Sequence, residues 1–239
     1  MRVCVLFSGG KDSTYAAWEA SKKDDLACLV TLFPKSAMSY MFHFPNLRWT
    51  ALQADSIGVP LLAEQTEGVK EEELADLNRA LAGAKSRFGL EGVYTGALAS
   101  VYQKTRVERI CRDLGLECIS PLWGIDPEVH LRRLVSSGFS VIIVSVSALG
   151  LDETWLGREL DESSVAELVA LSRKYTFHAG LEGGEGETFV LDAPFFSRTI
   201  RIRSARKHWR GDSGAFEIRD AVLVQKVRPE GAVLSPGPD

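Results

Sequence analysis

The residues best suited to chemistry form a polar loop near the start of the chain, where positions 8–13 read SGGKDS. The loop follows the apolar run 3–7, which is typical of a buried strand, and precedes residues 16–20, which are apolar except for one glutamate and predict the start of a helix. The first turn of a helix presents unpaired N–H groups and a partial positive charge, which suit an anion such as phosphate. The loop therefore predicts a phosphate-binding site.

The residue types within the loop support this prediction. Glycine lets the backbone approach phosphate oxygens and adopt positive φ, and lysine supplies a full positive charge. The aspartate would repel bare phosphate, so we expect it to help hold Mg²⁺ or to cap the helix. The alternative is a solvated Ser/Gly turn. The loop is not a Walker A motif, in which four residues separate the two glycines, because here the glycines are adjacent. We expect the phosphate groups of a ligand to contact all six residues: Ser8, Gly9, Gly10, Lys11, Asp12 and Ser13.

A second segment, residues 182–188 with the sequence EGGEGET, places three carboxylates among three glycines. Mutual repulsion makes such a cluster costly unless something positive lies beside it. Mg²⁺, ammonium, an arginine or a cationic substrate could supply this positive charge. A solvated flexible loop is the alternative. Because an extended run follows at 188–191, we favour a functional role for Glu182, Glu185 and Glu187.

Two further segments could line a site. Residues 96–108 begin at a strand end and continue into a helix that Ser100 could cap, with Gln103 and Arg106 about one turn apart and able to face one ligand. The alternative is an ordinary surface helix. Residues 38–43 are rich in Met and aromatic side chains, Tyr40 among them, and could line a pocket or form the edge of the core.

The elements that position these residues alternate between strand and helix over the first two thirds of the chain. Strands are expected at 3–7, 26–33, 59–63, 92–95, 117–119 and 141–146, with helices at 46–57, 70–87, 101–114 and 127–137. This pattern predicts a doubly wound, mostly parallel α/β sheet over residues 1–149. Ligands bind at the carboxyl ends of such strands, so Thr31 and Gly96 join the expected nucleotide site.

The pattern changes after residue 150. One helix is expected within 160–175, capped by Asp161 or Ser163, followed by extended runs at 188–191, 199–203 and 216–224, the last able to pair antiparallel with an earlier run. We interpret residues 150–227 as a smaller α+β lobe. The Pro- and Gly-rich residues 228–239 predict a disordered tail.

Composition restricts the class of protein. Apolar residues make up 45% and charged residues 25%, as in ordinary globular proteins, and the net charge of −4 favours no nucleic-acid partner. No apolar run approaches the roughly 20 residues that cross a bilayer, and no signal pattern precedes the loop, so we expect a cytoplasmic protein without membrane contact. Four cysteines without a C-x-x-C pair argue against structural zinc.

The loop at 8–13 resembles the S-G-G-x-D-S signature of the N-type ATP pyrophosphatases. Together with segments 39–41, 96–108, 121–124, 150–158 and 182–188, in this order, it resembles the diphthine–ammonia ligase family over about residues 1–225. The chain is similar to the short archaeal type. One departure is Gly186, where family members usually carry an aromatic residue, and this leaves the backbone freer and argues against stacking there.

The resemblance implies that ATP, with Mg²⁺, adenylates the carboxylate of diphthine on translation elongation factor 2, and that ammonia then displaces AMP to give the amide. Lys11 would offset negative charge on the pyrophosphate, and Asp12 would place the metal. The three glutamates would attract ammonium, deprotonate it or face the trimethylammonium group of the substrate, and aromatic faces at Tyr40, Phe42, Tyr102 and Trp155 would also suit that cation. The implied substrate-binding residues are Tyr40, Ser100, Tyr102, Gln103, Arg106, Glu182, Glu185 and Glu187, and the catalytic ones are Lys11, Asp12, Glu185 and Glu187.

Other readings of the sequence stay open. A tRNA sulfurtransferase would share the loop, but it needs a reactive cysteine and a basic RNA surface, and a nucleotide sensor would bind ATP or AMP without catalysis. Residues 198–210 are locally basic and could form a solvated strand face or bind an acidic protein or RNA. The nitrogen source and the oligomeric state, a homo-oligomer included, are left undecided.

Overall fold

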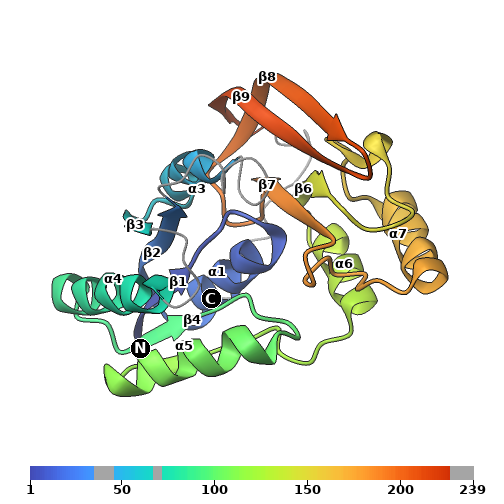
Figure 1. Cartoon of the computed structure of the whole chain (residues 1–239). Coiled ribbons are helices and arrows are strands. Elements are labelled where there is room, and N and C mark those ends of the chain that lie inside the picture. The colour runs from blue at the N-terminus through green and yellow to red at the C-terminus, as the bar shows by residue number, and fades with distance from the viewer. Residues whose placement is uncertain (35–45, 67–71, 227–239) are drawn as a thin grey trace, which may run out of the picture.

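The computed structural model describes residues 1–34, 46–66 and 72–226 (Figure 1). The first half of the chain alternates strands and helices as expected. Its elements are β1 (Arg2–Leu6), α1 (Lys11–Lys23), β2 (Asp25–Pro34), η1 (Leu47–Trp49), α3 (Thr50–Ile57), β3 (Leu61–Thr66), α4 (Glu72–Phe88), β4 (Gly92–Tyr94), α5 (Val101–Asp113) and β5 (Glu117–Ile119).

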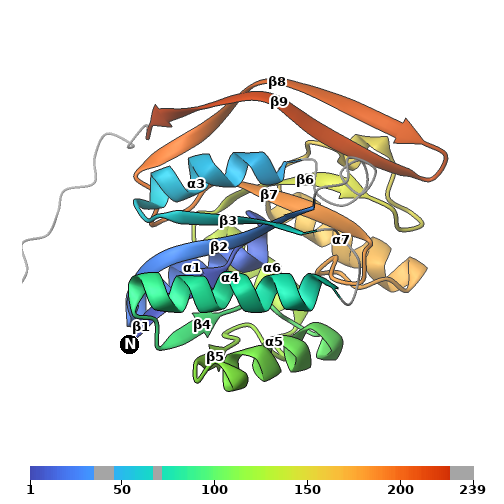
Figure 2. The ribbon, with the colours of Figure 1, turned by 60° about the vertical axis from the view of Figure 1, so that its left-hand side comes forward.

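These five strands form one parallel sheet in the order β3-β2-β1-β4-β5, which confirms the α/β class predicted from the sequence. Side chains alternate between its faces, because successive residues of a strand point to opposite sides. Val3 and Val5 pack with α1 and α3, whereas Cys4 packs with α4 and α5. With both faces covered by helices, β1 is buried and ends at the loop 8–13 (Figure 2).

The second half contains a four-stranded antiparallel sheet in the order β7-β6-β9-β8. The β8–β9 pairing confirms that the run at 216–224 pairs antiparallel with an earlier run. The elements of this half are α6 (Pro127–Ser136), β6 (Ser140–Val146), η2 (Glu153–Trp155), α7 (Glu162–Tyr175), β7 (Gly186–Asp192), β8 (Arg198–Arg210) and β9 (Ser213–Gln225).

Strand β6 corrects one expectation. The strand predicted at 141–146 forms, but it pairs antiparallel with β7 and β9 and does not extend the parallel sheet. Its residues Val141 to Val146 are all buried. A continuous apolar run predicts that a strand is buried on both faces, but it does not predict whether the neighbouring strands are parallel or antiparallel. The change from one sheet to the other therefore falls between β5 and β6.

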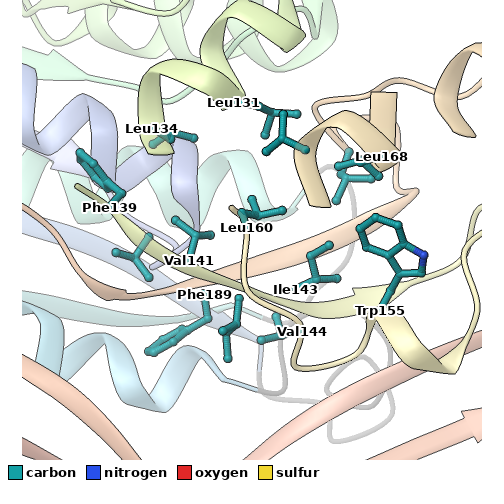
Figure 3. Close-up of a cluster of buried hydrophobic side chains, with 14 of the residues drawn as sticks. Leu131, Leu134, Phe139, Val141, Ile143, Val144, Trp155, Leu160, Leu168 and Phe189 are labelled. Carbon is teal, nitrogen blue, oxygen red and sulfur yellow. The ribbon is translucent and has the colours of Figure 1, made fainter. Parts of the chain in front are cut away.

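The largest hydrophobic cluster lies between the antiparallel sheet and helices α6 and α7 (Figure 3). Trp155 and Phe189 are among its largest fully buried side chains. Helix α7 begins in a capping box in which Asp161 accepts a hydrogen bond from Ser164 N, so Asp161 is the cap. In the described ranges no helix is both long and apolar enough to cross a membrane. The predicted tail at 228–239 lies outside the described residues.

Candidate active site

The loop after β1 is shaped by its own hydroxyl groups and by one glycine in the left-handed region. Gly9 has φ of 80°, and a Cβ there would lie 2.4 Å from Oε1 of Gln53, so only glycine fits. The hydroxyls of Ser8 and Ser13 lie 3.1 Å apart, and the Ser13 hydroxyl donates to Gly10 O. Gly10 precedes α1 without a side-chain cap, which leaves the first turn of this helix open to an anion.

Strand β7 holds this loop from the second sheet. Lys11 N donates to the Thr188 hydroxyl at 3.1 Å, and Val190 N donates to Gly9 O at 3.1 Å. Fully buried Gln53 from α3 links the same two segments, because its Nε2 donates to Gly9 O and to Val190 O. The loop and the strand that continues the acidic segment are therefore one structural unit. Gln53 could not be predicted from the sequence, since a single glutamine on a helix carries no signal of burial.

Lys11 and Asp12 form an oriented pair in which Lys11 is buried and Asp12 is half-buried. Lys11 is only 3% exposed, and its Nζ donates to Asp12 Oδ2 at 2.7 Å and to Gly180 O at 2.5 Å. Burial opposes the charge on Asp12, but the Lys11 ammonium and a hydrogen bond from His130 outweigh it and hold the pKa of Asp12 below its usual value. The carboxylate is thus kept ionised at the end of the loop 8–13.

His130 is a further residue of the site that the sequence analysis missed. It lies on α6 with no exposed surface, and its Nε2 is 2.8 Å from Asp12 Oδ1. Its Nδ1 is buried and has no hydrogen-bond partner among the described residues, and Tyr15 packs edge-on against its ring. No spacing motif surrounds this histidine, so only the fold reveals its contact with a residue more than 100 positions away.

Two of the three glutamates bind backbone N–H groups. The oxygens of Glu182 accept hydrogen bonds from Leu98 N at 3.1 Å and Ala99 N at 2.9 Å. Burial, and then repulsion from Asp12, raises the pKa of Glu182. Glu185 accepts hydrogen bonds from His178 N and Gly183 N, so its carboxylate is held within its own turn.

Glu187 differs from the other two. It lies on β7 opposite Ser145 of β6, and its carboxylate has no hydrogen-bond partner within the described part of the chain. Burial is the main cause that raises the pKa of Glu187 to about 7, with Asp12 adding to the effect and Lys11 opposing it. Glu187 therefore faces the Lys11–Asp12 pair as a carboxyl group that can exchange a proton near neutral pH.

At two further positions only glycine fits, because another backbone segment lies too close for a Cβ atom. A Cβ on Gly96 would lie 2.7 Å from the backbone of Asp12 and Ser13, so the segment after β4 packs directly on the start of α1. A Cβ on Gly186 would lie 2.5 Å from Ser145 O. The expectation that Gly186 leaves the backbone freer is therefore wrong, because this residue is buried and paired with Val146 in the sheet.

The remaining predicted residues have other placements. The Thr31 hydroxyl donates to Phe7 O at 2.6 Å and so braces the end of β1. Ser100 caps α5 as expected, since its hydroxyl accepts from Gln103 N. Arg106 lies 3.3 Å above the Tyr102 ring and lines a groove of about 750 Å³ between α4 and α5, whose lining contains no residue of the loop 8–13.

One aromatic candidate is excluded and two lie outside the described residues. Trp155 is 2% exposed and belongs to the hydrophobic core, so its ring cannot receive a substrate cation (Figure 3). Arg158 already lies 4.3 Å from the centre of that ring. Tyr40 and Phe42 fall in the segment 35–45, which the structure does not describe. Tyr102 remains an exposed candidate.

Comparison with known proteins adds independent information. A family model described as the diphthamide synthase N-terminal domain matches residues 1–118, and the corresponding C-terminal domain model matches residues 126–224. The human protein named diphthine–ammonia ligase is 34% identical over 225 residues, covering 86% of this chain and 84% of that protein. The mouse protein of the same name is 35% identical with the same coverage.

Two further matches differ in how much of the other protein they span. The Schizosaccharomyces pombe diphthine–ammonia ligase is 33% identical and covers 98% of this chain, which spans 41% of that longer protein. A solved structure from Methanocaldococcus jannaschii, titled as a predicted subunit of tRNA methyltransferase, superposes with a TM-score of 0.42 at 17% identity and covers 81% of this chain and 98% of that one. The two matching domain models and the relatives above 30% identity show that this chain belongs to the diphthamide synthase family.

Proposed function

We propose that this protein is a diphthine–ammonia ligase, which uses ATP and ammonium to convert diphthine on translation elongation factor 2 into diphthamide in the cytoplasm. The names of its relatives support the reaction. The observation that carries the proposal is the joining of the phosphate loop to β7 through Lys11 and Thr188. This contact puts a group suited to ATP activation beside Glu187, a group suited to proton transfer.

In the first step, a carboxylate oxygen of diphthine attacks the α-phosphorus of ATP. An oxygen–phosphorus bond forms, the bond between the α and β phosphates breaks, and pyrophosphate leaves. Backbone N–H groups at the start of α1 and the Lys11 ammonium would stabilise the negative charge on the leaving group. Lys11 is held in place by Asp12 and by Gly180 O, so little reorganisation is needed during the reaction.

Asp12 is the residue that would hold Mg²⁺ in this site. Magnesium in nucleotide enzymes is often bound by one or two carboxylates together with phosphate oxygens. The Asp12 carboxylate is ionised and makes two hydrogen bonds, so it keeps free acceptor positions for a cation. This donor set fits the ion, which when bound neutralises charge on the phosphates. Among the described residues no group of three or more His, Cys, Asp or Glu side chains could hold a metal by itself.

In the second step, ammonia attacks the acyl carbon of the adenylate. Ammonium must first lose a proton, because only neutral ammonia has a free electron pair. Glu187 accepts this proton, and its raised pKa makes it a stronger base than an ordinary glutamate. A carbon–nitrogen bond forms, the carbon–oxygen bond to AMP breaks, and a second proton passes from nitrogen to solvent. A catalytic role of Glu185 stays a prediction, with its carboxylate bound in its own turn.

The test is pyrophosphate release with purified diphthine-bearing elongation factor, ATP and ammonium. We expect release that requires the factor, and AMP in equal amount. Release that instead requires tRNA and a sulfur donor would overturn the proposal in favour of a sulfurtransferase. ATP binding without pyrophosphate release under any of these conditions would indicate a nucleotide sensor.

A further inference from the structure

The β8–β9 hairpin is the most basic part of the molecule. Its strands pair from Arg198 opposite Gln225 to Arg210 opposite Ser213, and the hairpin arches over α3 (Figure 2). Residues 198–225 contain seven Arg or Lys residues and three Asp or Glu residues, a net charge of +4, whereas the whole chain carries −4. This separation of charge indicates a surface for an acidic partner.

One face of the hairpin is used for packing and the other is open. Ile200, Ile218 and Ala221 are buried against the rest of the molecule. Trp49 Nε1 from η1 donates to Ile218 O, which fixes the inner face against this part of the chain. The outer face presents exposed cationic side chains, and these are Arg201, Arg203, Arg206, His208, Arg210 and Arg219.

The positive charge of this face is only partly compensated. Glu217 pairs with His208 at 2.9 Å and with Arg219 at 3.5 Å, and Asp220 lies 4.0 Å from Arg203. Within the described ranges, Arg201, Arg206 and Arg210 have no carboxylate partner. Three guanidinium groups are therefore available to a ligand.

The pairing register connects this face to the candidate active site. His208 pairs with Ala215, Ala215 with Ser145, and Ser145 with Glu187, so one row of residues crosses all four strands. Directly paired residues point to the same face of a sheet. His208, with Arg206 and Arg210 two positions to either side, thus shares a face with Glu187. Three strand spacings separate the ends of the row, about 14 Å.

The surface fits a protein better than a nucleic acid. Glu217 and Asp220 lie among the arginines, where they would repel phosphates but can accept hydrogen bonds from a protein of mixed charge. Trp209, the aromatic residue of β8, is only partly exposed and packs against the hydrophobic core, so no ring is offered for base stacking. We propose that the outer face of the β8–β9 hairpin docks an acidic patch of the protein that carries the diphthine, an inference that rests on the function proposed above.

The test is a charge-reversal variant, Arg206→Glu with Arg210→Glu, measured for amidation of the diphthine-bearing factor. We expect KM for the factor to rise about tenfold or more, with kcat and the KM for ATP unchanged, because opposite charges at an interface act mainly on association. Arg206→Lys with Arg210→Lys should restore most of the affinity. Arg112→Glu with Arg133→Glu, exposed positions on α5 and α6, is the matched control and should leave KM unchanged.

Each outcome separates this inference from the proposed function. Full amidation by wild type together with an unchanged KM in the charge-reversal variant would overturn the docking surface and leave the function intact. No amidation by wild type would overturn the proposed function. In that case, direct binding of the purified factor to wild type and to the charge-reversal variant would still test the docking surface. Loss of binding to an RNA duplex, with binding of the factor unaffected, would assign the face to nucleic acid. Thermal melting and ATP binding report whether the variants fold.

Discussion

Replacing Glu187 with glutamine tests the electrostatics of the site through the pH dependence of stability. The pKa of Glu187 is raised from 4.5 to about 7, mainly by burial, with repulsion from Asp12 added. Between these two pH values the folded protein therefore binds a proton more tightly than the unfolded chain does. The stabilisation is complete below the unfolded pKa and is lost as the pH rises through the folded one.

The magnitude follows from the size of the pKa change. One pKa unit corresponds to about 1.4 kcal/mol, so ionising Glu187 in the folded state costs about 3 kcal/mol by pH 8. Glutamine does not titrate. Relative to wild type, Glu187→Gln should therefore gain about 3 kcal/mol of unfolding free energy between pH 4 and pH 8. For a chain of this size the gain is about 6–12 °C in Tm.

The assay is urea unfolding of both proteins at several pH values, with Glu117→Gln as the control. Glu117 is an exposed glutamate on β5, and its replacement should leave the pH dependence unchanged. Stability curves for wild type and Glu187→Gln that run parallel from pH 4 to pH 8 would refute the reasoning. Such a result would mean that Glu187 is ionised in the folded protein at the same pH as in the unfolded chain.

Substitutions at three other residues probe the site. Lys11→Ala should lower the rate of pyrophosphate release by about 10²–10³-fold, and a near-normal rate would contradict its role beside the leaving group. His130→Leu removes the hydrogen bond to Asp12, so this variant should raise the pKa of Asp12 and shift the acid limb of the pH–rate profile upward. His130→Gln should largely restore the wild-type profile. Equal pH–rate profiles for wild type, His130→Leu and His130→Gln would show that His130 does not position Asp12. Gly96→Ala should cost about 1–3 kcal/mol of unfolding free energy, because its Cβ would lie 2.7 Å from the backbone of α1, and denaturant unfolding measures this cost.

The sequence predicted the parts of the molecule that depend on local patterns. The loop at 8–13 was predicted to join a strand to a helix, because glycine, lysine and hydroxyl residues follow a β-branched run, and the structure places it between β1 and α1. The position of Gly96 against this loop followed from the rule that strand ends meet at one edge of a parallel sheet. Residues 39–41, which also contribute to the family resemblance, lie outside the described part of the chain.

The rest depended on contacts between distant segments. Strand β6 has the apolar run of a parallel strand, and only its partners make it antiparallel. Gln53 and His130 are single polar residues on helices, and nothing in their neighbourhood distinguishes them from exposed residues. Trp155 was expected to offer an aromatic face to a cation, and its charged neighbours Glu153 and Arg158 gave no sign that the fold buries its ring in the core.

The central claim is that the phosphate loop and β7 form one site that couples ATP cleavage to amide formation. The most direct measurement follows pyrophosphate, AMP and incorporation of isotope-labelled ammonium into the diphthine-bearing factor in a single reaction, for wild type and for Glu187→Gln. We predict equal amounts of the three products with wild type, and pyrophosphate release that outpaces labelling with Glu187→Gln. Labelling by the variant at the wild-type rate over the whole pH range, or pyrophosphate release by wild type without labelling, would contradict the account.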